Sequence, residues 1–270
     1  MTRPRASDSL LPCRIVREAS LPLVATAIHA GHGVRAEVAA RLALDPEARR
    51  REEDPFTDRW TTMAPVRVIA TVSRFEVDLN RPREQAVYRA PGDAWGLEVW
   101  TTPLPEDVVA RSLARYDAFY DAVGALLDEM HERFGSYVVL DLHSYNHRRD
   151  GPDAPPARSD ENPEVNLGTG SLDGERFGGV VERLAHALRS PDGGPADLDV
   201  RADVKFRGGH FSRWINARHP GSACAIAIEF KKTFMDEWTG APDEEAIARL
   251  GRRLASAVPP VLGELLAVSR

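Results

Sequence analysis

Three apolar, β-rich runs separated by segments of helical periodicity constrain the fold of this chain most strongly. They read LPLVATAIHA at 21–30, SYVVLDLH at 136–143 and ACAIAIEF at 223–230. Runs of this length and composition are typical of buried strands. Strands that alternate with helices predict a parallel or mixed sheet covered by helices. We therefore expect a three-layer α/β/α fold with a central mixed, largely parallel sheet.

Apolar residues recur at i, i+3 and i+4 spacing in three segments. This spacing predicts helices over 105–135, around 174–189 and over roughly 243–266. A proline pair at 259–260 is expected to interrupt the last of them, because proline lacks a backbone donor.

The remaining segments carry weaker signals. We expect a strand over 66–80, a hairpin at the sheet's edge over 87–103, a long surface loop over 147–170, a moderate strand over 197–206, a loop over 208–220, and a loop or short irregular helix over 45–65.

Composition and charge limit the class of protein. No internal repeat or low-complexity linker divides the chain, so we expect one domain over 1–270 with a poorly defined segment at 1–19. Lys+Arg 35 against Asp+Glu 41 gives a net charge of −6, which argues against a nucleic-acid partner. No run of 18 apolar residues and no signal-peptide pattern occurs, so we expect no membrane partner and a cytoplasmic location. The two cysteines, Cys13 and Cys224, show neither a disulfide framework nor a nucleophile signature.

The three buried-looking strands end in residues that can bind a metal or act as an acid. These residues are His29, His143 and Glu229. In open α/β sheets, sites form beyond the carboxyl ends of the strands. Two imidazoles and a carboxylate are a common catalytic zinc set, with a fourth position left for water. The alternative is that each is an ordinary buried residue.

A third ligand would come from the acidic segment REEDPFTDRW at 51–60. Its candidates are Glu52, Glu53, Asp54 and Asp58. A solvated acidic face is the alternative interpretation of this segment. His32, three residues after His29 across a glycine turn, is a competing ligand or a surface residue.

Two further segments are suited to binding an anion. Asn80 and Arg81 follow the 66–80 strand together with Asp78, and Arg offers planar, bidentate donors for a carboxylate. Arg213 and His210 lie beside two glycines that let the backbone approach a ligand. An ordinary surface salt bridge is the alternative, but two arginines favour an anionic substrate.

Seven short motifs, in this order, resemble those of the N-formylglutamate amidohydrolase family. They are HAG (29–31), REEDPFTDRW (51–60), VDLNR (77–81), LDLHS (140–144), NLGT (166–169), FRGGHFSR (206–213) and AIEFKKTFMDE (227–237). The resemblance runs from about residue 20 to the C-terminus. It implies a core fold similar to that of zinc carboxypeptidases, with one Zn²⁺ per chain.

The resemblance also implies roles for individual residues. His29 and His143 match the family's metal-binding histidines, and Asp54 matches its carboxylate ligand, with Glu53 as the rival. Asp141, two residues before His143, is expected to orient that imidazole or to cap a loop.

The resemblance also implies which residues bind the substrate and which residue is the general base. Asn80 and Arg81 match a pair that binds a substrate carboxylate, Arg213 matches a second anion contact, and Glu229 matches the general base. The chain departs from the family at His210, where the family's GGY reads GGH, and at its HSG segment, which reads HAG.

The implied function is a zinc-dependent amidohydrolase that acts on a linear amide. Its default reaction is N-formyl-L-glutamate plus water to formate and L-glutamate, so its partner is a small anionic N-acyl amino acid. The alternatives are a carboxypeptidase-like enzyme or other N-acyl amino acid deacylase, and a non-catalytic protein that binds small carboxylates.

Overall fold

The computed structural model describes residues 10–18, 20–190 and 198–269, in which seven strands form a single sheet of order β1-β3-β2-β4-β7-β5-β6. The strands are β1 (Cys13–Arg17), β2 (Leu23–Ala27), β3 (Val66–Ala70), β4 (Tyr137–Tyr145), β5 (Val165–Gly168), β6 (Val200–Ala202) and β7 (Ala223–Lys231). The four central strands β3, β2, β4 and β7 are parallel, whereas β1 pairs antiparallel with β3 and β5 pairs antiparallel with β7. The predicted mixed, largely parallel sheet is confirmed.

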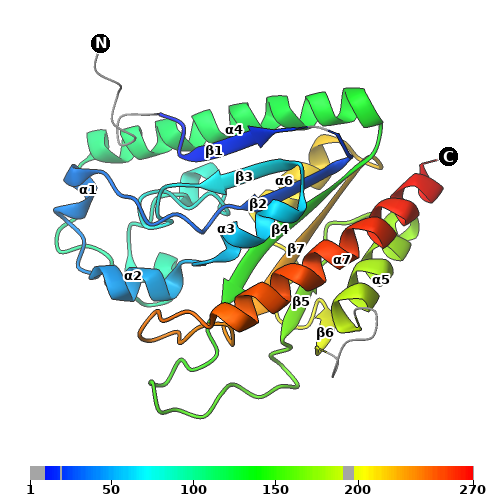
Figure 1. Ribbon diagram of the computed structural model, residues 1–270. Helices are drawn as coiled ribbons and strands as arrows, with labels where there is room; N and C mark the ends of the chain where they lie inside the picture. The colour runs from blue at the N-terminus through cyan, green and yellow to red at the C-terminus, as the bar shows by residue number, and fades with distance from the viewer. Residues whose placement is uncertain (1–9, 19, 191–197, 270) are drawn as a thin grey trace.

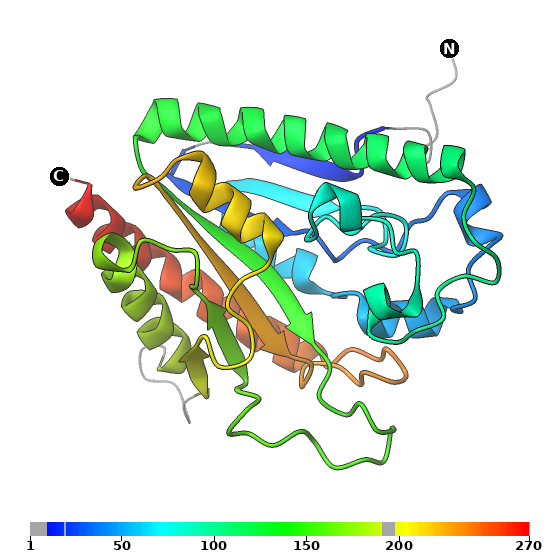
Figure 2. The ribbon, with the colours of Figure 1, turned by 180° about the vertical axis from the view of Figure 1, so that it is seen from behind.

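Helices cover both faces of this sheet. The α-helices are α1 (Ala36–Ala39), α2 (Pro46–Glu52), α3 (Thr57–Trp60), α4 (Glu106–Phe134), α5 (Gly174–Arg189), α6 (His210–Arg218) and α7 (Glu244–Val268), and the 3₁₀ turns are η2 (Thr61–Met63), η3 (Arg83–Gln85) and η4 (Pro91–Ala94). Helices α5 and α7 lie against one face, and α4 and α6 lie against the other (Figures 1 and 2). The three-layer arrangement is therefore as predicted, and none of the described helices is both long and apolar enough to cross a membrane.

Alternate residues of the central strands face the two helical layers. Leu140 and Ile226 pack with α5 and α7, whereas Val139 and Ala225 pack with α4 and α6. All four are at most 1% exposed. Strands buried on both faces are apolar along their whole length, which explains the continuous apolar runs in the sequence. Each fully buried large aliphatic side chain contributes about 1.5–3 kcal/mol.

Helix α6 stands where a loop is expected over 208–220. Two glycines precede it, and Gly208 has a φ of +97°. Within the helix, Phe211 and Ile215 are one turn apart, and both are 0% exposed against the α4 layer. The two apolar residues at i and i+4 were the available signal for a helix.

The proline pair does not interrupt α7, so that expectation is wrong. The helix runs continuously over Glu244–Val268 with Pro259 and Pro260 inside it. Both prolines are exposed. Ala255 and Ser256, whose carbonyls lose their helical donors to the prolines, are exposed too, so water can replace those donors.

The edges of the sheet also differ from expectation. Residues 87–103 form no hairpin but η4 and irregular chain, with Trp95 and Gly96 at positive φ and one isolated bridge from Trp100 to Leu42. Of the 1–19 segment, residues 1–9 and 19 lie outside the described residues, while Cys13–Arg17 add β1 to the sheet.

Several weak signals correspond to shorter elements. The strand expected over 66–80 ends at Ala70, and the 45–65 segment forms α2, α3 and η2. The strand expected over 197–206, whose first residue lies outside the described part of the chain, is only Val200–Ala202.

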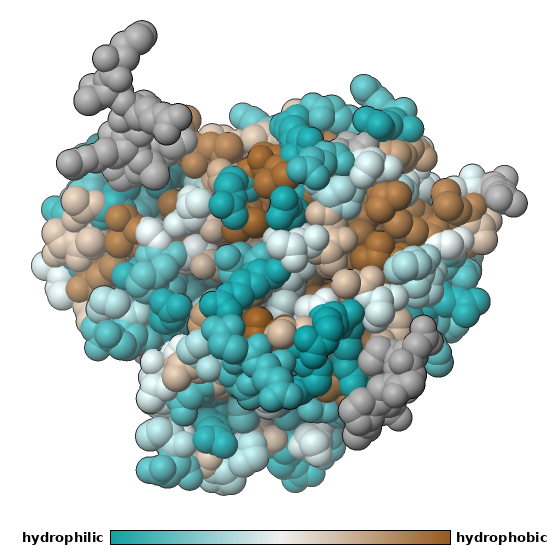
Figure 3. All heavy atoms as spheres, in the orientation of Figure 1, coloured by the Kyte–Doolittle hydropathy of each residue, from teal (hydrophilic) through white to brown (hydrophobic). Residues whose placement is uncertain are grey.

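A long loop connects β4 to β5 across residues 146–164, and β5 itself lies within the loop expected over 147–170. It extends away from the sheet in Figures 1 and 2, and the side chains in that part of Figure 3 are mostly hydrophilic. Its first end is held by the buried Glu237 carboxylate, which accepts from the amides of His147 at 2.7 Å and Arg148 at 2.9 Å. Its second end is held by a hydrogen bond from the Tyr145 hydroxyl to the Pro163 carbonyl.

Candidate active site and metal centre

The parallel strands bring three of the predicted site residues to one edge of the sheet. His143 lies near the carboxyl end of β4, directly opposite Glu229 of β7 in the strand register. His29 follows the end of β2, the neighbour of β4 on its other side, by two residues. Carboxyl ends of adjacent parallel strands necessarily meet, so the fold itself gathers these side chains.

Asp54 reaches the same edge from the connection between α2 and α3. Its backbone amide donates to the carbonyl of His29 at 3.0 Å. Phe56, at a φ of 71°, turns the chain into α3, and the Thr57 hydroxyl donates to the Asp54 carbonyl at 2.7 Å. The acidic segment is thereby fixed against the end of β2.

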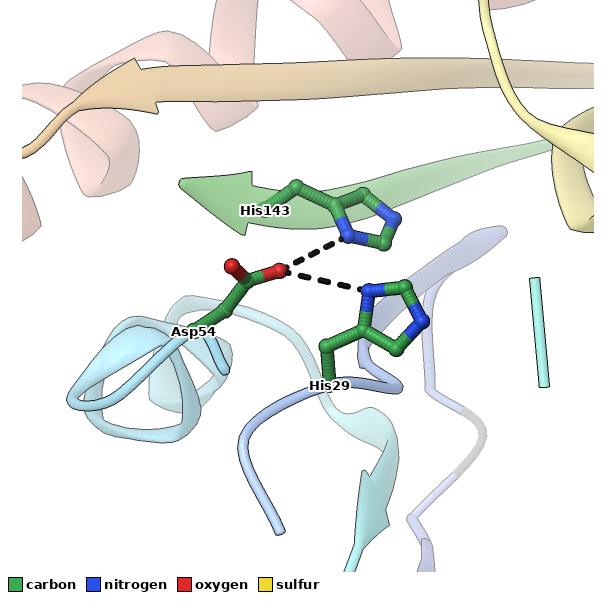
Figure 4. A group of neighbouring side chains, drawn as sticks. All are labelled: His29, Asp54 and His143. Carbon is green, nitrogen blue, oxygen red and sulfur yellow. Dashed lines mark hydrogen bonds and ion pairs between the residues drawn. The ribbon is translucent and has the colours of Figure 1, made fainter. Parts of the chain in front are cut away.

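His29, Asp54 and His143 form a compact buried cluster (Figure 4). The Asp54 Oδ2 atom lies 3.4 Å from His29 Nδ1 and 3.0 Å from His143 Nδ1. One candidate ligand atom from each residue lies within 4.8 Å of the others, and each residue is 2% exposed. Two nitrogens and one carboxylate oxygen facing a common point fit the ligand set of a catalytic zinc.

The outer nitrogens of both imidazoles are held by carboxylates. His29 Nε2 lies 2.7 Å from Asp78 Oδ1, and His143 Nε2 lies 2.9 Å from Asp141 Oδ2. Ser144 donates to the other oxygen of Asp54 at 3.1 Å. Such contacts fix the ring orientation of metal-binding histidines and leave Nδ1 as the available ligand atom.

Of these supports, Asp141 makes the contact expected of it, whereas the contact of Asp78 with His29 was not anticipated. The sequence places Asp78 beside Asn80 and Arg81 as part of the anion-binding segment. Its isolation between Val77 and Leu79, both 1% exposed, was the signal for a buried functional carboxylate.

Electrostatics of the cluster follow from burial and these contacts. Burial opposes ionisation of Asp54, but the hydrogen bonds from His143 and His29 hold its pKa below its usual value. Burial also opposes the charged form of His143, yet the Asp141 carboxylate raises the pKa of this imidazole well above its usual value. Metal binding at His143 would therefore compete with protonation.

Geometry separates Glu53 from Asp54, the two candidates that the sequence leaves open. The Glu53 carboxylate contacts His32 Nδ1 at 2.6 Å and accepts a hydrogen bond from the Ser73 hydroxyl. It therefore faces away from the two histidines. His32 is occupied in the same contact and is not part of the cluster.

The other acids of the segment do not join the cluster either. Glu52 accepts from Asn146 Nδ2 at 3.0 Å, and Asp58 lies in α3. Because Glu52, Glu53 and Asp54 are all buried, a solvated acidic face is the wrong interpretation of these three residues.

A cavity of about 520 Å³ opens over the cluster and includes Glu229 in its lining. Among the described residues, none donates a hydrogen bond to the Glu229 carboxylate. Burial raises the pKa of Glu229 to about 7. A partly buried carboxyl group that faces a cavity, at a pKa near neutrality, is suited to proton transfer.

The predicted anion-binding residues line the same cavity. Asn80 Oδ1 accepts from the Phe211 amide at 2.9 Å, at the start of α6. A Cβ at Gly209 would lie 2.2 Å from Asn80 Oδ1, so only glycine permits this approach. Arg81 Nε lies 3.8 Å from Asp78 Oδ2, and Arg213 donates to the Gly208 carbonyl at 2.8 Å.

The lining is basic although the whole chain is acidic. Its acidic residues are Glu52, Asp54 and Glu229, and its basic residues besides histidine are Arg74, Arg81, Arg149, Lys205, Arg207, Arg213 and Lys232. Sequence reasoning singled out only Arg81 and Arg213 among these. His210 also lines the cavity, with its Nε2 3.3 Å from the Tyr116 hydroxyl.

Comparison with known proteins supports a family assignment. The family model described as N-formylglutamate amidohydrolase matches residues 21–235. An N-formylglutamate amidohydrolase from Ralstonia eutropha JMP134 is similar in structure, with 21% identity, a TM-score of 0.73, and coverage of 96% of this chain and 98% of its own. The gene product Atu2144 from Agrobacterium tumefaciens has 19% identity, a TM-score of 0.66 and 95% coverage of each chain.

Two other comparisons concern a further solved structure and the curated proteins. A metallo-carboxypeptidase from Burkholderia cenocepacia aligns at 16% identity over 91% of this chain and 57% of its own, with a TM-score of 0.34. A search of curated proteins gave no match. Because the family match spans well over half of the sequence, the chain belongs to the N-formylglutamate amidohydrolase family.

Proposed function

We propose that the protein is a zinc-dependent amidohydrolase that converts N-formyl-L-glutamate and water to formate and L-glutamate. Family membership supports the amidohydrolase class. The observation that carries the zinc dependence is the convergence of His29, Asp54 and His143 at the floor of a cavity that also contains Glu229.

These three residues would hold one zinc ion per chain through His29 Nδ1, His143 Nδ1 and the Asp54 carboxylate. The set matches the three protein ligands of catalytic zinc sites, and its rotamers are fixed by Asp78, Asp141 and Ser144. Lewis-acid activation of water and of an amide carbonyl is the chemistry that such an ion supplies when bound.

Glu229 is the proposed general base and acid. Its carboxylate accepts the proton of the water that attacks the formyl carbon. It then returns that proton to the amide nitrogen as the C–N bond breaks, which releases formate and the free amine of glutamate. A positioned group in this role contributes roughly 10²–10⁴-fold to the rate.

Substrate carboxylates are the proposed ligands of the basic residues in the cavity. Asn80 and Arg81 would bind one carboxylate, and Arg213 on α6 would bind the other. Bidentate contacts between guanidinium and carboxylate supply both affinity and orientation.

A second candidate is a deacylase for larger N-acyl amino acids or short acidic peptides. The cavity of about 520 Å³ lies in the size range of pockets that enclose drug-sized ligands, whereas N-formylglutamate is much smaller. The 146–164 loop also extends away from the sheet rather than lying across it (Figure 2).

Hydrolysis assays decide between these functions. The zinc-loaded protein is incubated with N-formyl-L-glutamate, N-acetyl-L-glutamate and a dipeptide ending in glutamate, and the free amine is measured. Fastest release from the formyl substrate supports the proposal. Faster release from either larger substrate would replace it with the second candidate. Zinc and glutamate binding without turnover of any substrate would indicate a non-catalytic protein.

A further inference from the structure

A buried lysine connects the segment that carries Asp54 to the strand that carries His143. Lys232 follows the end of β7 and is 1% exposed. Its Nζ donates to the Arg51 carbonyl at 2.5 Å, to the Glu53 carbonyl at 2.8 Å and to Asn146 Oδ1 at 2.9 Å. All three protons of the ammonium group are thus used.

The two carbonyls belong to Arg51, in the last turn of α2, and to Glu53, the residue directly after the helix. Helix α2 ends at Glu52, so the carbonyls of its last turn need partners from elsewhere. Lys232 donates to the carbonyls of the residues before and after Glu52. The carbonyl of Glu52 itself accepts a hydrogen bond from Arg74 at 3.3 Å. The chain is therefore held at three successive residues directly before Asp54.

The third contact links this segment to β4. Asn146 lies three residues after His143, and its amide also donates to the Glu52 carboxylate at 3.0 Å. The ammonium of Lys232 contacts neither histidine of the cluster. Besides the attraction between its charge and the Asp54 carboxylate, Lys232 can affect the cluster through the backbone that it holds.

We propose that Lys232 is a positioning residue, which fixes the 51–54 segment so that the Asp54 carboxylate meets Nδ1 of His29 and of His143. The effect on metal binding rests on the proposed zinc centre. The ordering of the 51–54 segment does not, so the two parts are tested separately.

Only a charged side chain with several donors can make these contacts in a buried place. Burying an ammonium group is unfavourable unless its protons are hydrogen-bonded, and here all of them are. A Lys232→Met side chain has a similar length but no donor, so it leaves the Arg51 and Glu53 carbonyls without this partner.

Lys231 provides a matched control. It is the preceding residue of β7, is 8% exposed, and points to the opposite face of the strand. Among the described residues, its side chain makes no hydrogen bond or ion pair. Lys231→Met therefore removes the same charge from a neighbouring buried place without touching the 51–54 segment.

The experiment compares wild type, Lys232→Met and Lys231→Met in two measurements. Backbone hydrogen exchange of the metal-free proteins is expected to be faster over residues 51–57 in Lys232→Met alone, including the Asp54 amide that donates to His29. Calorimetric titration with zinc is expected to give a Kd about 10- to 100-fold higher in Lys232→Met than in the other two, as for other residues that orient metal ligands.

The outcomes separate this inference from the proposed function. If Lys232→Met binds zinc as tightly as the wild type and exchanges its backbone hydrogens at the same rate over residues 51–57, the inference is overturned, even if the melting temperature of the variant is lower. Absence of zinc binding in the wild type would contradict the proposed centre, while the exchange comparison would still decide whether Lys232 holds the segment. Should Lys232→Met not fold, Lys232→Gln, which keeps an amide donor, is expected to show the same two changes at smaller size.

Discussion

Two acidic residues that are adjacent in the sequence, Glu53 and Asp54, have different surroundings. Asp54 faces His29 and His143, whereas the adjacent Glu53 contacts His32 and Ser73 on the other side of the chain. Both carboxylates are 2% exposed. Burial does not distinguish them, so the direction of the side chain decides which of them can bind a metal with the two histidines.

Removal of the Asp54 carboxylate is expected to abolish tight zinc binding. Asp54→Ala leaves two imidazoles, which cannot complete a catalytic zinc site. We expect its zinc Kd to rise by more than the roughly 10- to 100-fold that residues behind the ligands contribute. Glu53→Gln, the matched control, is expected to stay within about 10-fold of wild type by calorimetry. The reverse order of the two variants would show that Glu53 is the ligand.

Loss of the Glu229 carboxylate is expected to slow the reaction without loss of zinc. Glu229→Gln keeps the shape of the side chain but cannot accept a proton, so kcat should fall by roughly 10²–10⁴-fold. Because burial raises the pKa of Glu229 to about 7, wild-type kcat/KM should fall as the pH drops below about 7 and the base becomes protonated. Equal kcat values for wild type and variant would contradict this role.

At the residue scale, the sequence predicts the meeting of two histidines and one acid, and the contact of Asp141 with His143, but not the roles of Asp78 and Lys232. His29, His143 and Glu229 stand at the ends of apolar strands, and parallel strands end at one edge, so local pattern suffices. Lys232 and Asp78 act through contacts with residues distant in sequence, such as Arg51 and His29. No local pattern encodes those contacts.

Among the secondary-structure elements, long periodic segments and apolar strands were predictable, whereas α6 and β1 were not. The spacing of apolar residues predicts α4 and α5 to within about two residues. Helix α6 and strand β1 are short, and both are stabilised by packing or pairing with distant elements. Tertiary contacts of this kind outweigh local propensity.

A histidine at the end of α6 should make stability depend on pH. His219, the residue after α6, stacks on His131 of α4 at 4.5 Å between ring centroids. Its Nδ1 lies 2.7 Å from the Tyr137 hydroxyl, and its Nε2 lies 3.1 Å from Asp128 Oδ1. Burial, together with the neighbouring His131, lowers the pKa of His219 in the folded protein.

The sign of the effect follows from this lowered pKa. Below the unfolded value of about 6.5, the unfolded chain binds the proton more readily, so the free energy of unfolding falls as the pH decreases from about 7 to 5. Urea unfolding across this range should show a smaller decrease for His219→Asn than for wild type. An identical decrease in both proteins would assign the acid sensitivity to other groups.

The molecule as a whole is built so that three distant parts of the chain meet at one place. Residues 29, 54 and 143 come from the turn after β2, from the α2–α3 connection and from β4, and they converge beneath a basic cavity in a chain of net charge −6. A ligand that binds all three at once should therefore stabilise the entire fold.

Zinc is expected to raise the melting temperature of the whole protein. Binding to the folded state alone adds about 2.7 kcal/mol to the free energy of unfolding when free zinc is 100 times its Kd. Thermal unfolding with zinc and with a chelator measures this difference. Asp54→Ala is the control, because its melting temperature should be the same in both conditions. A shift of equal size in that variant would indicate that zinc binds elsewhere.

The fastened ends of the 146–164 loop have an evolutionary consequence. Glu237 holds its first residues, and Tyr145 contacts Pro163 at its other end, so the chain between them can be lengthened or shortened without moving β4 or β5. Each doubling of a flexible loop costs only about 0.6 kcal/mol in closure entropy. Insertions and deletions can therefore accumulate between these anchors while the sheet edge that carries His143 keeps its geometry.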